Sequence, residues 1–114
     1  MPSDPRQFLY DIASATEALR EFTRDRSFQD YEHDLMLRSA CERQLEIVGE
    51  AMTRLRDQHP DVFERVRDGR AIIALRNRLI HGYDSVDDEI VWDVITRKLA
   101  DLDGIAKQLI EDPE

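Results

Sequence analysis

The chain has 114 residues, of which 41% are hydrophobic and 36% charged, and a formal net charge of −9. This balance is typical of a folded, well-solvated protein of one domain, here residues 1–114, and it excludes a disordered chain. No apolar run approaches the roughly 20 residues of a membrane span. The acidic balance weighs against broad, nonspecific nucleic-acid binding, which depends on basic surface. Because the opening residues, 1–6, form no apolar signal region, a cytoplasmic protein is expected.

Helical signals begin at Asp4, which is expected to cap a helix that starts with Pro5 and to form a capping box with Gln7. The helix should end near the polar residues 23–26. Apolar residues recur in it at spacings of four and three, as one helical stripe: Phe8, Ile12, Ala15, Leu19 and Phe22.

A second helix is expected to start at Ser27, with Asp30 three residues later, and to run as one long helix to about Arg56. Its apolar stripe consists of Leu37, Cys41, Leu45, Val48, Met52 and Leu55. Cys41 is the only cysteine, which excludes an intrachain disulfide and a cysteine-rich zinc site. Its place on the stripe predicts a small buried hydrophobe.

His59 and Pro60 break this pattern, and a short helix over 61–67 and a turn at 68–69 are expected next. A third main helix over 70–80 should stop at Gly82, since glycine accepts the left-handed conformation.

Asp87 is expected to cap the last main helix, with Val86 and Val91 as a hydrophobic staple. The apolar stripe of this helix is Val91, Ile95, Leu99, Leu102, Ile105 (or Ala106) and Leu109. The sequence therefore predicts an all-α, up-and-down bundle of four main helices plus one short helix. Such near-heptad stripes suit a bundle core and a homodimer interface equally well.

The most chemically suggestive segment is 76–83, which places Arg76, His81 and Tyr83 at the end of the third main helix. Arginine suits a phosphate and the charge that builds on it, and histidine transfers protons near neutral pH, so the pair indicates phosphodiester chemistry. The alternative is structural: Arg76 takes part in a salt bridge, and His81 favours the negative end of the helix dipole.

Helix geometry sets a condition on this site. Residues five apart on a helix point about 140° away from each other, so Arg76 and His81 would not share a face. They could meet if the helix ends at His81 and Gly82, or if a second subunit supplies one of them. Asn77 and His81, four apart, would align.

Glu42, Glu46 and Glu50 form an acidic row on the second helix. A metal site is conceivable there, but pairing with nearby arginines is favoured.

Fourteen of the sixteen cationic residues are arginine. This bias is compatible with a local phosphate-binding cleft and equally with genome composition.

Several segments resemble the HEPN superfamily, and more closely the HepT-type toxins, whose signature is Arg-x4-His-x-Tyr. The similar segments are residues 76–83, 86–92, 42–51 and 10–12. The resemblance implies a metal-independent endoribonuclease without a cofactor. It also implies that the enzyme is the toxin of a toxin–antitoxin pair, with its RNA cleft between the subunits of a homodimer.

The resemblance further implies a role for each residue of the signature. Arg76 and His81 would be the catalytic pair, Asn77 a supporting polar residue, and Tyr83 the hydroxyl that receives AMP. The enzyme that attaches AMP would be an MntA-type minimal nucleotidyltransferase, the antitoxin. Two alternatives stay open: a non-catalytic helical module that binds nucleotides or docks onto a nucleotidyltransferase, and a plain dimeric scaffold with Arg76 and His81 facing solvent.

Overall fold

The computed structural model describes residues 3–82 and 86–112, and within them the chain forms helices and no strand. The helices are α1 (Pro5–Thr23), α2 (Phe28–His33), α3 (Leu35–Gln58), α4 (Pro60–Phe63), α5 (Gly69–His81), α6 (Asp88–Asp93), a π-helical turn η2 (Val94–Lys98) and α7 (Leu102–Glu111). The predicted all-α class is therefore confirmed. Within the described ranges, no helix is both long enough and apolar enough to cross a membrane.

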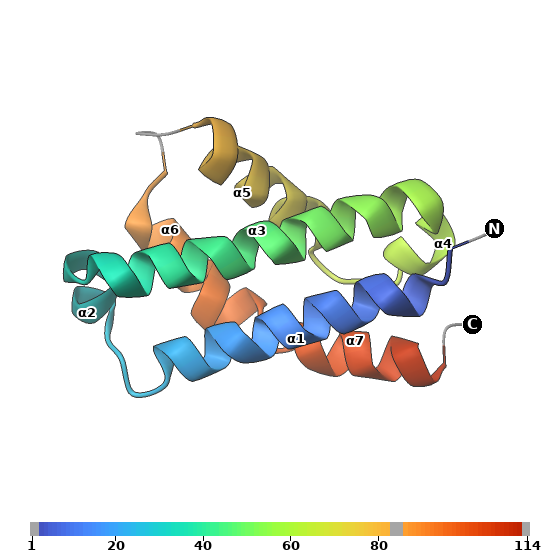
Figure 1. Cartoon of the computed structure of the whole chain (residues 1–114), viewed down its shortest axis with the longest axis horizontal. Coiled ribbons are helices and arrows are strands. Elements are labelled where there is room, and N and C mark those ends of the chain that lie inside the picture. Colours follow the sequence, from blue (N-terminus) through green and yellow to red (C-terminus); the bar gives the residue numbers. More distant parts are fainter. Residues whose placement is uncertain (1–2, 83–85, 113–114) are drawn as a thin grey trace.

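The two longest helices, α1 and α3, run side by side in opposite directions through the length of the molecule (Figure 1). Helix α7 packs against α1, and α5 packs against α3. Helix α3 therefore has α1 on one flank and α5 on another, and this arrangement positions the candidate site.

The apolar stripes of the helices meet in one core. All six stripe residues predicted for the second helix are buried, and Cys41 is among them with no exposed surface. The first stripe is buried except at its end, where Phe22 keeps 36% of its surface exposed.

The predicted long helix over 27–56 is two helices, because the chain bends at Asp34. The capping box of Ser27 and Asp30 is present and begins α2, as predicted. Asp34, however, adopts an extended backbone, and its Oδ1 accepts a hydrogen bond of 3.1 Å from the backbone N–H of Leu37. This side chain competes with the continuing helix by capping the start of a new one.

The predicted last helix is also divided. Asp87 caps α6 as expected, and its side chain accepts from the backbone N–H of Glu89. The π turn η2 and the residues up to 101 then separate α6 from α7. Since α6 packs against α2 whereas α7 packs against α1, the chain has to change direction between them.

Three local predictions need correction. The side chain of Asp4 accepts from the backbone N–H of Arg6, so the expected box with Gln7 is not formed. The short helix α4 ends at residue 63 instead of 67. The third helix stops at Gly82 as expected, but this glycine has a right-handed backbone (φ −93°) instead of a left-handed one. Its N–H donates to the carbonyl of Arg78 at 2.7 Å and so closes the last turn.

Candidate functional site

The site begins with the close approach of α5 to α3. A Cβ built on Gly49 of α3 would lie 2.2 Å from Cβ and 2.3 Å from Cγ of Arg76 in α5. Only a residue without a side chain fits there, so Gly49 allows the aliphatic stem of Arg76 to lie directly on α3. Sequence reasoning missed this role, although a glycine inside a helical pattern is a known signal of close packing.

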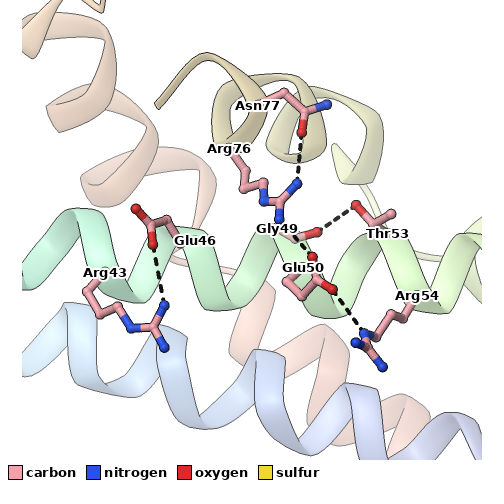
Figure 2. A network of polar contacts seen from close by, with 8 residues as sticks. All are labelled: Arg43, Glu46, Gly49, Glu50, Thr53, Arg54, Arg76 and Asn77. Carbon is pink, nitrogen blue, oxygen red and sulfur yellow. Dashed lines mark hydrogen bonds and ion pairs between the residues drawn. The ribbon is translucent and has the colours of Figure 1, made fainter. Parts of the chain in front are cut away.

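Two side chains hold the Arg76 guanidinium in place (Figure 2). Nη2 donates to Oε2 of Glu50 at 2.8 Å, and Nη1 donates to Oδ1 of Asn77 at 3.0 Å. Only 23% of the Arg76 side chain is exposed, and its buried Nε has no hydrogen-bond partner among the described residues. Arg76 is thus salt-bridged, as the structural alternative expected, but it is packed against α3 instead of facing solvent.

Arg76 lines an open groove of about 950 Å³ whose walls come from α1, α3 and α5. Its charged lining residues are Asp11, Arg43, Glu46, Glu50, Arg54 and Arg76. We call this feature the α1–α3–α5 groove. Three arginines face three carboxylates here, so the groove is close to neutral on a chain of formal charge −9.

Two of the three carboxylates in the acidic row of α3 pair with arginines, as the favoured interpretation of the row predicted. Oε1 of Glu50 accepts from Nε of Arg54 at 3.0 Å, and Oε2 of Glu46 lies 3.4 Å from Nη1 of Arg43. Glu42 is half-buried, and this burial raises the pKa of its carboxyl. Residues 3–82 and 86–112 contain no group of three or more histidine, cysteine or carboxylate side chains placed to hold a metal ion.

His81 is the last residue of α5 and is exposed. The helix ends at Gly82, but His81 is still inside it, so the angle of about 140° between Arg76 and His81 persists. Ile80 lines the groove with Arg76, whereas His81 is not among the lining residues. A single chain therefore does not bring Arg76 and His81 together. Asn77 is exposed and lies one turn before His81, and Tyr83 lies outside the described residues.

The family model for ribonuclease HepT-like proteins matches residues 12–109. The chain belongs to this family. It is 33% identical over 112 residues to a probable ribonuclease HepT of Thermococcus cleftensis, covering 96% of this chain and 98% of that protein. It is 32% identical over 111 residues to a putative RNase of Methanocaldococcus jannaschii, covering 97% and 91%. A putative RNase of Caldanaerobacter subterraneus is 32% identical over 107 residues, with 94% and 95% covered.

No solved structure matches the chain. The family expected from residues 76–83 and the accompanying segments is nevertheless confirmed, and with it the assignment to a ribonuclease family.

Proposed function

We propose that this protein is a metal-independent endoribonuclease and the toxin of a toxin–antitoxin pair, with Arg76 and His81 as its catalytic residues. Membership of the ribonuclease HepT-like family supports the activity. The observation that carries the site is the placement of Arg76, which is held by packing on Gly49 and aimed into a charged groove.

The residue types suit RNA cleavage because RNA carries its own nucleophile. The 2′-hydroxyl attacks the adjacent phosphorus, the bond to the 5′-oxygen breaks, and the products are a 2′,3′-cyclic phosphate and a 5′-hydroxyl. His81 accepts the proton of the 2′-hydroxyl as general base, a role worth about 10²–10⁴-fold in rate, and the leaving 5′-oxygen takes up a proton from water. Arg76 neutralises the charge on the phosphate oxygens, which is greatest in the transition state.

The site is proposed to form between two copies of the chain. Within α5, Arg76 packs on α3, whereas His81 lies about 140° around the helix and outside the groove, so one helix does not direct both side chains at the same phosphate. A two-fold dimer in which each chain supplies Arg76 to one site and His81 to the other removes this conflict.

Regulation by an MntA-like nucleotidyltransferase antitoxin follows from the same segment. Tyr83 is two residues beyond His81 in the sequence and is the proposed acceptor of AMP. An attached AMP would bring a bulky anion to the RNA site, where it would compete with substrate phosphate for Arg76. The RNA substrate and the antitoxin would both be met in the cytoplasm.

Cleavage of total RNA by the purified dimer, in the presence of EDTA, tests the activity. Arg76→Ala and His81→Ala should each reduce cleavage by at least 10², because each removes a group that acts in the transition state. Two matched controls should leave cleavage unchanged: Arg70→Ala, at the start of α5, and His33→Ala, on the exposed surface of α2. If each of the two single variants, Arg76→Ala and His81→Ala, still cleaves RNA like the wild type, these residues are not catalytic.

The rival, a non-catalytic module that binds nucleotides or docks onto a nucleotidyltransferase, predicts that no RNA is cut and that expression without the antitoxin is harmless. A toxin should arrest growth when expressed alone, and His81→Ala should relieve the arrest.

Modification of Tyr83 is tested by intact mass after co-expression with the antitoxin. The mass should rise by one or more AMP units, and Tyr83→Phe should abolish the rise. Tyr10→Phe is the matched control, because Tyr10 is 60% exposed and also offers a phenol to the antitoxin. A Tyr83→Phe chain that still gains the mass would place the modification elsewhere.

A further inference from the structure

One carboxylate in the α1–α3–α5 groove lies between two guanidinium groups (Figure 2). Oε2 of Glu50 accepts from Nη2 of Arg76 at 2.8 Å, and Oε1 accepts from Nε of Arg54 at 3.0 Å. The two arginines, one from α3 and one from α5, hold the two anionic oxygens of Glu50. Two arginines can hold the two free oxygens of a phosphodiester in the same way. Glu50 therefore occupies the position in which these arginines would bind a phosphate.

The two arginines differ in how firmly they are held. The stem of Arg76 is packed on Gly49, and its side chain is only 23% exposed, so its guanidinium is positioned before any ligand arrives. Arg54 and Glu50 are 59% and 45% exposed, and exposed ion pairs of this kind contribute little to stability. Giving up the Arg54–Glu50 pair therefore costs little, and Arg76 keeps an ionic partner if another anion takes the place of Glu50.

The groove also continues along α3 beyond this position. Arg43 and Arg54 are eleven residues apart, which places them on nearly the same face of the helix and about 16 Å apart along its axis. Arg76 reaches in from α5 between them, as Figure 2 shows. The three arginines are balanced by Asp11, Glu46 and Glu50, so the groove becomes a cationic track only where a ligand displaces a carboxylate. Arginines spaced over this length then suit the phosphates of a single strand, which such proteins recognise by charge more than by base identity.

We propose that Arg54 and Arg76 together grip the scissile phosphodiester of a single-stranded RNA, in the position that the Glu50 carboxylate occupies in the free chain. Arg54 is then a substrate-binding residue, and Glu50 is an internal competitor that RNA has to displace. This inference rests on the proposed ribonuclease function for the identity of the ligand.

Binding of a fluorescent, single-stranded oligoribonucleotide with 2′-O-methyl groups throughout tests the proposal by anisotropy. The missing 2′-hydroxyl prevents cleavage, so affinity is measured without turnover. Arg54→Gln should weaken binding about tenfold, since a hydrogen bond to a charged group is lost. It should also lower the slope of log K against log salt by about 0.7, the value for one phosphate contact on a single strand.

Two further variants separate binding from folding. Arg54→Lys keeps the charge and should retain the salt slope of the wild type while losing part of the affinity. Glu50→Gln keeps the shape but removes the competing charge, and it should tighten binding a few-fold. A residue that only orients Arg76 would instead weaken binding when changed.

The matched control is Arg56→Gln, on the same helix. Arg56 is exposed, pairs with its neighbour Asp57 at 3.0 Å, and lies outside the groove, so affinity and salt slope should match the wild type. Equal melting temperatures would show that all variants are folded.

The proposal is overturned if Arg54→Gln binds like Arg56→Gln, if Glu50→Gln binds more weakly than the wild type, or if the wild type does not bind the oligonucleotide. Failure of the proposed function gives a different result. If ordinary RNA is bound with this dependence on Arg54 but is never cut, the proposed catalytic function is wrong and the proposed binding role of Arg54 is supported. If RNA is cut through Arg76 and His81 but Arg54→Gln has no effect, the binding role of Arg54 is wrong and the catalytic function is supported.

Discussion

Replacing Gly49 by alanine tests the contact that positions Arg76. Alanine is normally preferred to glycine inside a helix by about 0.5–1 kcal/mol, so without a tertiary contact the change would stabilise α3. Here the new Cβ would lie 2.2 Å from Cβ and 2.3 Å from Cγ of Arg76. These atoms are next to the backbone of α5 and not at the end of a flexible side chain, so α5 itself has to move.

Overpacking of this kind costs typically 1–3 kcal/mol. After the gain in helix propensity is subtracted, we expect Gly49→Ala to lower the free energy of unfolding by about 1–2 kcal/mol. It should also reduce RNA cleavage, because the Arg76 guanidinium moves with the helix. Gly104→Ala is the matched control, since a Cβ on Gly104 of α7 meets nothing within 4 Å. That change should stabilise the protein by about 0.5–1 kcal/mol.

Urea unfolding followed by circular dichroism measures both changes on the same scale. The two alanine substitutions should have opposite signs. If Gly49→Ala is as stable as Gly104→Ala and cleaves RNA at the wild-type rate, the close packing of α3 and α5 does not position Arg76.

Three further predictions concern the rest of the fold. Hydrogen bonds from Arg6 lower the pKa of Asp4 from 3.8 to about 2, so this carboxylate stabilises the fold above pH 4 and loses its effect as the pH falls toward 2. Asp4→Asn should therefore lower the melting temperature at pH 7, and a difference that persists undiminished at pH 2 would contradict this cause. Asp34→Ala removes the cap that starts α3 and should lower the free energy of unfolding by about 1 kcal/mol in urea titrations, whereas an unchanged value would show that the cap does not contribute. Burial raises the pKa of the Cys41 thiol to about 11, so iodoacetamide should label it at pH 8 only after unfolding, and rapid labelling of the native protein would refute its burial.

Local sequence patterns predicted much of the fold because they report local physics. The capping box at Ser27, the cap at Asp87 and the stripe from Leu37 to Leu55 all follow from residues within one or two turns of each other, and all are present. The divisions of the second and last helices were not predicted. One continuous helix and two helices divided by a cap at Asp34 both satisfy the same apolar pattern, so the pattern cannot distinguish the two structures.

The candidate site was predictable only in part, for a related reason. Segment 76–83 identified Arg76 and His81 as candidates, but the α3 residues that hold Arg76, Glu50 and Gly49, lie more than 25 positions earlier in the chain. Contacts with Glu50 and Gly49 depend on how two helices cross, and no periodicity within either helix contains that information. The α1–α3–α5 groove could not be predicted either, because it depends on how three helices pack together.

In the proposed dimer, Arg76 and His81 act on one phosphate from different copies of the chain. Heterodimers purified through two different tags test it directly, by RNA cleavage. A dimer of one Arg76→Ala chain and one His81→Ala chain has one intact shared site of two, so it should recover about half of the wild-type activity although each homodimer is inactive. A dimer of one wild-type chain and one chain carrying both substitutions should be inactive. The opposite pattern, with the first heterodimer inactive and the second half-active, would contradict the shared site.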